Sequence, residues 1–273
     1  MADARVGISG WTYPPWRGVF YPKGLAHKRE LSFAASQLST IEINGTFYSL
    51  QRPTSFAAWY DQTPPGFVFS VKGGRFITHM KKLANVDTAL ATFVASGLLA
   101  LRDKLGPVLW QLPPNLGFHP DRLADFFALL PRSTGEAAWL ARKHDERIKD
   151  RALTTTDADR PMRHALEVRH DSFLVPAFLD LLREHAIAVV VADTAGKWPQ
   201  IRELTADFGY LRLHGADELY VSGYTPESLD DWAGLVRRWR DTGHDVFTYF
   251  DNDVKVRAPF DAMALADRLR IAP

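Results

Sequence analysis

Short apolar runs alternate with amphipathic stretches along the whole chain. Each run is four to six residues long, and each is followed by a segment long enough to hold a helix. Runs of this length between helical patterns are typical of buried parallel strands. They predict eight strands, at residues 6–9, 40–44, 68–72, 108–111, 164–169, 188–193, 210–214 and 246–251.

The stretches between these runs carry apolar residues at helical spacing. The i, i+3, i+4, i+7 pattern predicts helices over residues 123–130 and 175–182, and a longer stripe predicts one over residues 90–101. Thr225 followed by Pro226 indicates an N-cap with proline at the first helical position. Eight strands alternating with helices predict an α/β fold, a (β/α)₈ TIM-like barrel. An open doubly wound sheet is the alternative, but no glycine-rich phosphate turn follows residues 6–9 to support it.

One polar segment interrupts this alternation. Residues 133–161, between the fourth and fifth predicted strands, are rich in charged side chains, and their pattern predicts one helix near residues 136–147. We therefore expect a surface insertion within a single barrel domain that spans residues 1–273.

The two faces of the predicted strands differ in polarity. One set of alternate positions is apolar, as helices packed on the outside require. The opposite set is polar and lies late in the strands, at the end where barrel active sites are built. This set comprises Glu42, Asn44, Ser70, Lys72, Gln111, Glu167, Arg169, Arg212 and His214. Because ionised groups are costly to bury unless they pair, we expect a functional pocket here. The alternative is a structural ion network, for example between Glu167 and Arg212.

Composition and charge narrow the classes of function. The chain has 33 Lys and Arg against 32 Asp and Glu, a formal net charge of +1, and no cysteine. Near-neutral charge argues against broad coating of nucleic acid, and the lack of cysteine removes disulfides, thiolate metal sites and cysteine nucleophiles. No apolar stretch reaches the length of a membrane span and no signal core is present, so we expect a cytoplasmic protein without a membrane partner.

The polar set contains candidates for acid–base chemistry and for anion binding. Two carboxylates in one pocket can have their pKa values pushed apart, which makes Glu42 and Glu167 the candidate catalytic pair. Cations suited to a phosphate or carboxylate come from three strands. The candidate ligand-binding residues are Trp11, Asn44, Lys72, Gln111, Arg169, Arg212, His214, Asp251 and Asn252. His79 is a further candidate for proton transfer or phosphate contact.

A divalent metal is the alternative use of the same carboxylates. The candidate ligands are Glu42, Glu167, Asp193, His214 and Asp251, and such oxygen-rich ligation would favour Mg²⁺ or Mn²⁺. Lys72, Arg169 and Arg212 would compete with the metal for these groups. The sequence therefore indicates no definite cofactor and leaves Mg²⁺ or Mn²⁺ open as the alternative.

Several motifs together resemble one known family, the domain of unknown function 72 family. The resemblance extends in order over nearly the whole chain and implies a TIM-like barrel, but it implies no particular reaction. The motifs are Gly7-Ile-Ser-Gly-Trp-Thr-Tyr13, Trp16-Arg-Gly-Val-Phe-Tyr-Pro22, Ile41-Glu-Ile-Asn-Gly-Thr-Phe-Tyr48, Phe69-Ser-Val-Lys72, Arg75-Phe-Ile-Thr-His79, Gly106-Pro-Val-Leu-Trp-Gln-Leu-Pro-Pro-Asn115, Glu167-Val-Arg-His170, Leu211-Arg-Leu-His-Gly215 and Tyr249-Phe-Asp-Asn-Asp253.

Three hypotheses for the function follow. The first is an enzyme that binds a small polar, anionic or phosphorylated metabolite and uses Glu42 and Glu167 for proton transfer. The second is a nucleic-acid-binding protein or an endonuclease IV-like, metal-dependent phosphodiesterase. The third is a sensor or scaffold without catalysis. All three leave the oligomeric state open.

Overall fold

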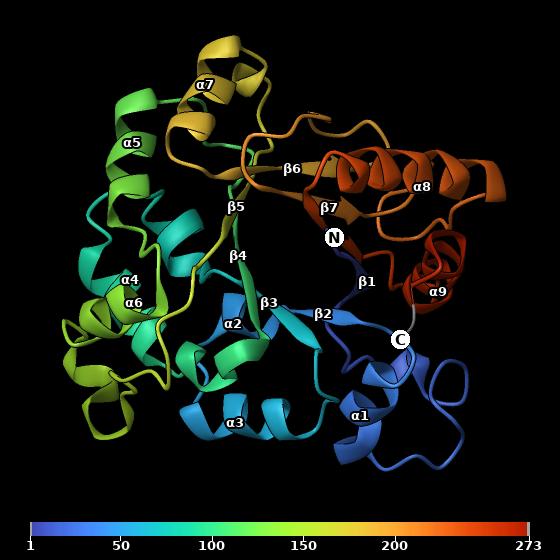
Figure 1. Cartoon of the computed structure of the whole chain (residues 1–273), viewed down its shortest axis with the longest axis horizontal. Coiled ribbons are helices and arrows are strands. Elements are labelled where there is room, and N and C mark those ends of the chain that lie inside the picture. Colours follow the sequence, from blue (N-terminus) through green and yellow to red (C-terminus); the bar gives the residue numbers. More distant parts are fainter. Residues whose placement is uncertain (1, 272–273) are drawn as a thin grey trace. The chain divides into compact units, whose positions relative to one another are not determined.

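The computed structural model describes residues 2–271 and has the predicted barrel. Within these residues, eight parallel strands close into a barrel in sequence order (Figure 1). The bounds differ from the predicted ones by at most three residues at either end. They are β1 Ala4–Ser9, β2 Thr40–Ile43, β3 Val68–Lys72, β4 Leu105–Gln111, β5 His164–Glu167, β6 Ala188–Asp193, β7 Phe208–Leu213 and β8 Asp245–Phe250.

Helices follow the strands, and several begin at a proline. Proline suits a first helical position because its fixed φ matches the helix and its missing N–H would be unpaired there. Thr225 caps α8 as predicted, accepting a 3.2 Å hydrogen bond from the Ser228 amide. The α-helices are α1 Glu30–Ala35, α2 Gly45–Tyr48, α3 Pro53–Asp61, α4 Asp87–Ala95, α5 Pro120–Leu129, α6 Thr134–Ala141, α7 Pro176–Glu184, α8 Pro226–Asp241 and α9 Ala258–Leu269.

The predicted helix over residues 90–101 is wrong in its second half. Helix α4 ends at Ala95, and the apolar stripe continues in a separate 3₁₀ segment, Leu98–Lys104. Gly97 lies between them with a φ of +130°, and a Cβ there would come within 2.6 Å of the Pro53 Cα. The stripe predicts the buried face correctly, but the close approach of Pro53 forces a turn that only glycine accommodates.

The insertion at residues 133–161 has two short elements rather than one. Helix α6 begins after Ser133, whose hydroxyl accepts from the Glu136 amide at 3.2 Å. A 3₁₀ segment, Glu146–Arg151, follows after Asp145 caps it. Ser133 and Pro161 form an isolated antiparallel bridge, so the two ends of the insertion meet.

The chain divides into two compact units. Unit 1 consists of Met1–Glu42 and Ala188–Pro273, and unit 2 consists of Ile43–Ile187. In unit 1, α9 packs against β1 and β8, and α8 packs against α9 (Figure 1). In unit 2, α4 packs against α6, and α3 packs against the 3₁₀ segment Leu98–Lys104.

Strand register brings the polar positions to the same level within each unit. In unit 1, Ser9 pairs with Glu42, and Arg212 pairs with Tyr249. In unit 2, Lys72 pairs with Leu109, and Gln111 pairs with Glu167. The alternate positions, such as Phe69, Trp110 and Leu211, are buried and apolar, which confirms the predicted polarity of the two strand faces.

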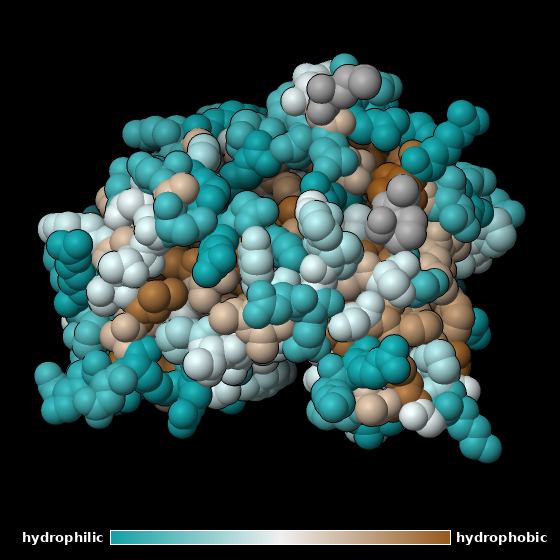
Figure 2. Space-filling model, turned by 60° about the horizontal axis from the view of Figure 1, so that its bottom comes forward, coloured by the Kyte–Doolittle hydropathy of each residue, from teal (hydrophilic) through white to brown (hydrophobic). Residues whose placement is uncertain are grey.

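The surface seen in Figure 2 is mostly hydrophilic, with apolar residues visible in smaller patches. None of the helices in the described part of the chain combines the length and the hydrophobicity that a membrane crossing requires.

Candidate functional site

Each unit carries one cluster of polar side chains at the carboxyl ends of its strands. In unit 1 the cluster consists of Ser9, Glu42, Tyr210, Arg212, His214 and Asp251, and we call it the Arg212 network. In unit 2 it consists of Lys72, Arg75, His79, Glu167 and Arg169, and we call it the cationic cluster.

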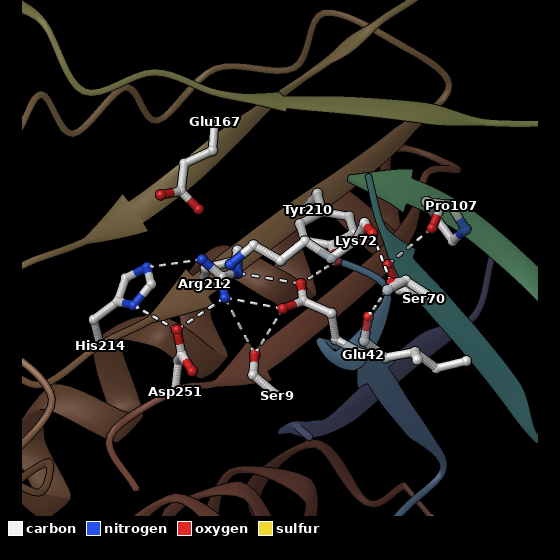
Figure 3. Close-up of polar contacts among 12 residues, drawn as sticks. Ser9, Glu42, Ser70, Lys72, Pro107, Glu167, Tyr210, Arg212, His214 and Asp251 are labelled. Carbon is white, nitrogen blue, oxygen red and sulfur yellow. Dashed lines mark hydrogen bonds and ion pairs between the residues drawn. The ribbon is translucent and has the colours of Figure 1, made fainter. Parts of the chain in front are cut away.

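Arg212 is the centre of the Arg212 network. Its Nε and Nη2 donate to the two carboxylate oxygens of Glu42 at 3.1 and 2.9 Å, and Nη2 also donates to Asp251 Oδ2 at 2.8 Å. Figure 3 shows the guanidinium between Glu42 on one side and Asp251 and His214 on the other. The Arg212 and Glu42 side chains are completely buried. One buried cation therefore holds two carboxylates, of which Glu42 is completely buried and Asp251 is 14% exposed.

Two hydroxyl groups complete the coordination of Glu42. Tyr210 donates to Oε2 at 2.6 Å and Ser9 donates to Oε1 at 3.0 Å. With the two bonds from Arg212, each oxygen of Glu42 accepts two hydrogen bonds. Four such bonds fix the position of the carboxylate. Arg212 pairs with Glu42, whereas the structural alternative drawn from the sequence had paired it with Glu167.

His214 lies between Arg212 and Asp251 in this network. Arg212 Nη1 lies 3.4 Å from Nε2 of the ring, and a guanidinium can only donate, so Nε2 is the accepting nitrogen in that contact. The other ring nitrogen, Nδ1, lies 3.1 Å from Asp251 Oδ2. The buried ring thus contacts both Arg212 and Asp251.

Asp193 and Asn252 have partners outside the Arg212 network. Asp193 Oδ2 accepts from the Tyr224 hydroxyl at 3.0 Å, and burial raises the pKa of Asp193. Burial raises the pKa of Tyr224 still further from its usual value, so that hydroxyl keeps its proton. Asn252 donates to Asp261 Oδ2 at 2.8 Å and to the Ser222 carbonyl at 2.9 Å. Its amide therefore ties the loop after β8 to α9.

Asp253 is a titratable group that is not among the site residues predicted from the sequence. Burial, and then the charge of Asp251, raise its pKa to about 6, while the Tyr13 hydroxyl acts in the opposite direction. Asp253 therefore changes protonation near neutral pH. The run 251–253 in the sequence shows two acidic residues, but the shift arises from burial and from proximity that only the fold creates.

The aromatic loop after β1 is largely packed. Trp16, Phe20 and Tyr21 are buried against one another, and the Tyr21 hydroxyl donates to the Trp11 carbonyl at 2.6 Å. Trp11 itself is half-buried.

In unit 2, Lys72 and His79 meet on one aromatic ring. Lys72 Nζ lies 4.7 Å from the centre of the Phe47 ring, and the His79 ring packs edge-on against Phe47 at 5.0 Å. The Thr46 hydroxyl donates to the Lys72 carbonyl at 2.7 Å, which joins the start of α2 to the end of β3. These contacts join residues of the 41–48 motif to residues of the 69–72 and 75–79 motifs, 25 or more positions further along the sequence.

Glu167 and Arg169 form a second buried ion pair. Arg169 Nε and Nη2 both donate to Glu167 Oε1, at 2.8 and 2.7 Å, and Glu167 is completely buried. Gln111, also buried, lies beside Glu167 in the strand register. Ser70, from the same polar set, donates to the Pro107 carbonyl at 2.8 Å (Figure 3).

The cationic cluster creates a positive potential around His79. Burial, and then the charges of Arg169, Lys72 and Arg75, lower the pKa of His79 to about 4, while the smaller effect of Glu167 acts in the opposite direction. His79 is therefore neutral at pH 7, and three cations in the cluster face one carboxylate. Arg75 is exposed and makes no hydrogen bond or ion pair with any residue of the described part of the chain.

Asn44 has an acceptor that the surrounding chain leaves unused. It lies directly after β2, and its Oδ1 is buried without a hydrogen-bond partner among the described residues. A buried acceptor of this kind is costly unless a donor reaches it.

The metal candidates do not gather into a metal site. Among residues 2–271, no three His, Asp or Glu side chains lie together in an arrangement that could hold an ion. The Arg212 guanidinium lies between Glu42 and Asp251, Arg169 binds Glu167, and Tyr224 binds Asp193. Cationic and hydroxyl donors thus contact the oxygens that a metal would need.

Comparison with known proteins agrees with the motifs. The family model described as protein of unknown function DUF72 matches residues 5–273. The chain is 24% identical over 249 residues to UPF0759 protein YecE of Escherichia coli K12, covering 87% of this chain and 82% of that protein. It is 23% identical over 277 residues to UPF0759 protein YunF of Bacillus subtilis 168, covering 91% and 88%.

Solved structures show the same fold. A DUF72 family protein of Thermotoga maritima, TM1631, superposes with a TM-score of 0.77 at 23% identity, over 98% of this chain and 99% of that one. A DUF72 family protein of Enterococcus faecalis, EF0366, superposes with a TM-score of 0.75 at 17% identity, over 99% and 96%. With the family model matching nearly its whole length, this chain belongs to the DUF72 family of TIM-like barrel proteins.

Proposed function

We propose that the protein is an enzyme that binds a small anionic metabolite, phosphorylated in the simplest case, at the cationic cluster of unit 2. The gathering of Lys72, Arg75 and Arg169 around a neutral histidine carries this proposal. A cluster with three cations and one carboxylate has a formal charge of +2, which an incoming phosphate would balance.

Arg75 is the group that supports an external anion most directly. It is exposed, while Arg169 is held by Glu167 and Lys72 is buried against Phe47. A guanidinium presents donors in a planar fork that matches phosphate and carboxylate oxygens. In this proposal Arg75 closes on the anion, and Asn44 Oδ1 accepts a hydrogen bond from a hydroxyl group of the same ligand.

Glu167 is the proton-transfer group in this proposal. Arg169 Nε and Nη2 both donate to Oε1, and these charge-assisted bonds orient the buried carboxylate. Glu42 accepts four hydrogen bonds inside the Arg212 network, and this coordination supports a structural role for it instead. The proposal therefore keeps one of the two glutamates of the predicted catalytic pair.

Phosphate binding tests the proposal directly. Inorganic phosphate should raise the melting temperature of the wild-type protein, because a ligand that binds only the folded state stabilises it. Arg75→Gln should weaken phosphate binding by about tenfold, the loss expected for one charge-assisted contact. Arg183→Gln, at an exposed position of α7, is the matched control and should leave the phosphate affinity unchanged.

The pKa of His79 provides a second measurement that does not depend on turnover. A phosphate bound beside Lys72 and Arg75 would offset their charges and raise the pKa of His79 from about 4. NMR titration of the histidine signals with and without phosphate measures this shift. An unchanged pKa together with unchanged binding in Arg75→Gln would overturn the proposal.

A further inference from the structure

The rim of the cationic cluster carries aromatic and thioether side chains that are left in water. Tyr48 is 71% exposed, Met80 is 64% exposed and Phe76 is 38% exposed. Tyr48 belongs to the 41–48 motif and Phe76 to the 75–79 motif, and Met80 directly follows the second motif. The proposed anion site uses none of these three side chains. Single exposed apolar residues are common, but here they flank one charged cluster on two neighbouring segments.

A rare backbone turn presents one of these segments. Residues Phe76–Met80 form a π-helical turn, closed by an i→i+5 hydrogen bond of 2.9 Å from the Lys81 amide to the Phe76 carbonyl. Such turns are frequent at functional sites. The wide turn directs His79 onto the Phe47 ring at 5.0 Å, which connects the 75–79 motif to α2.

Aromatic rings and cations alternate along this rim. Lys72 Nζ lies 4.7 Å from the Phe47 ring centre, and the Phe47 and Tyr48 rings meet edge to face at 5.1 Å. Lys81 Nζ and the Arg147 guanidinium lie 5.8 and 5.9 Å from the Phe76 ring centre. One phenyl ring thus separates the buried ammonium of Lys72 from the open phenol ring of Tyr48.

The aromatic residues of the loop after β1 show what this chain does with rings that only need burial. Trp16, Phe20 and Tyr21 pack against one another in unit 1 and are buried. Tyr48 contacts Phe47 but leaves most of its surface in water, and its hydroxyl makes no hydrogen bond with the described residues. A flat apolar surface beside an anion site fits a ligand with a planar ring attached to its anionic group.

We propose that the ligand of the cationic cluster carries a planar aromatic base, as a nucleoside monophosphate does, with its phosphate at Lys72 and Arg75 and its base stacked on Tyr48. This inference rests on the proposed anion site and names the chemical class of its ligand. Sequence-tolerant stacking of a base on an aromatic side chain is an established source of affinity. Lys81 adds a positive charge beside Phe76, whereas the Arg147 guanidinium is paired with Asp145 at 2.6 Å.

A comparison of two ligands that differ only in the base tests this inference separately from the proposed function. Calorimetric titration with adenosine 5′-monophosphate and with ribose 5-phosphate, at equal ionic strength, should give an affinity about tenfold higher for the nucleotide. Tyr48→Ala should remove the preference for the nucleotide, and Tyr48→Phe should retain it because the ring remains. Trp139→Ala, which removes a ring 58% exposed beside Lys143, is the control and should keep the preference.

The outcomes are distinct. Equal affinities for the two ligands, with both bound, would overturn the inference and leave the anion site intact. If neither of the two ligands bound, and inorganic phosphate did not bind either, the proposed function would be overturned as well. If an oligonucleotide bound much more tightly than the mononucleotide and Tyr48→Ala did not affect it, the site would belong to a nucleic-acid surface, and the inference would be wrong.

Discussion

The Arg212 network and the cationic cluster lie at equivalent ends of their strands but balance their charges differently. In the Arg212 network, one guanidinium serves two carboxylates, and hydroxyl groups fill the remaining positions on Glu42. In the cationic cluster, three cations surround one carboxylate, and Arg75 extends into solvent. Buried ions that satisfy one another stabilise a single arrangement, whereas surplus charge at the surface favours an external partner.

The two regions also differ in the charges that shift the pKa values of their titratable groups, His79 and Asp253. Burial, and then the neighbouring cations, keep His79 neutral. Burial, and then the charge of Asp251, favour the protonated form of Asp253. Burial thus favours the neutral form of both groups, and the neighbouring charges that add to it are cations at His79 and a carboxylate at Asp253.

The largest effect is expected at Arg212. Arg212→Met should lower the free energy of unfolding by about 3–5 kcal/mol, because it leaves Glu42 buried without its cation. Arg75→Met should change it by less than about 0.5 kcal/mol, because Arg75 is exposed. Urea unfolding of both variants measures the difference.

A double variant tests whether the unpaired charge of Glu42 causes the loss of stability in Arg212→Met. Glu42→Met combined with Arg212→Met removes the pair together and should recover part of the lost stability. Similar losses in Arg75→Met and Arg212→Met would contradict the distinction between a closed network and an open cluster.

The second-largest effect is expected at Glu167, where a substitution should change both phosphate affinity and stability. Glu167→Gln removes the only negative charge of the cationic cluster while preserving the shape of the side chain. The affinity for inorganic phosphate should rise several-fold, because the formal charge of the cluster increases by one. Stability should fall by about 1–3 kcal/mol, because Arg169 loses its carboxylate partner.

Glu42→Gln is the matched substitution in the Arg212 network. It should also lower the free energy of unfolding by about 1–3 kcal/mol, because Arg212 loses a carboxylate partner. The affinity for inorganic phosphate should stay unchanged. A fall in phosphate affinity in Glu167→Gln would show that the cluster does not bind the anion through its surplus charge.

A smaller effect is expected at Asp253. Its folded-state pKa of about 6 lies above the unfolded value of 3.8, so the folded protein binds more protons between these pH values. The contribution of Asp253 to stability is therefore present below about pH 4 and is lost as the pH rises through about 6. Asp253→Asn should raise the free energy of unfolding at pH 7 by about 1 kcal/mol, a value reduced for partial solvent exposure.

His79 should show the opposite pH dependence. Its folded-state pKa of about 4 lies below the unfolded value of 6.5, so its contribution to stability is lost as the pH falls from 6.5 towards 4. Denaturant curves collected from pH 4 to 8 for Asp253→Asn and His79→Gln measure both slopes. Slopes of the same sign in the two variants would contradict the opposite pKa shifts of Asp253 and His79.

The sequence by itself determined the barrel and most of its strands. Apolar residues recur every two residues in strands and every 3.6 residues in helices because of local backbone geometry. These patterns can therefore be recognised in the sequence without knowledge of long-range contacts. For the same reason the polar parity placed Glu42, Lys72, Glu167 and Arg212 late in their strands, where the structure has them. Thr225 and Pro226 fixed the start of α8 through their own chemistry.

The tertiary structure decided which of these groups interact and which remain exposed. Whether Arg212 meets Glu42 or Glu167 depends on closure of the sheet, because the partners are 170 residues apart in the sequence. The turn at Gly97 depends on the approach of Pro53, the pKa of Asp253 on burial beside Asp251, and the exposure of Tyr48 on what packs around Phe47. Periodicity records which face of an element is apolar, whereas pairing, burial and electrostatic potential arise only when distant segments meet.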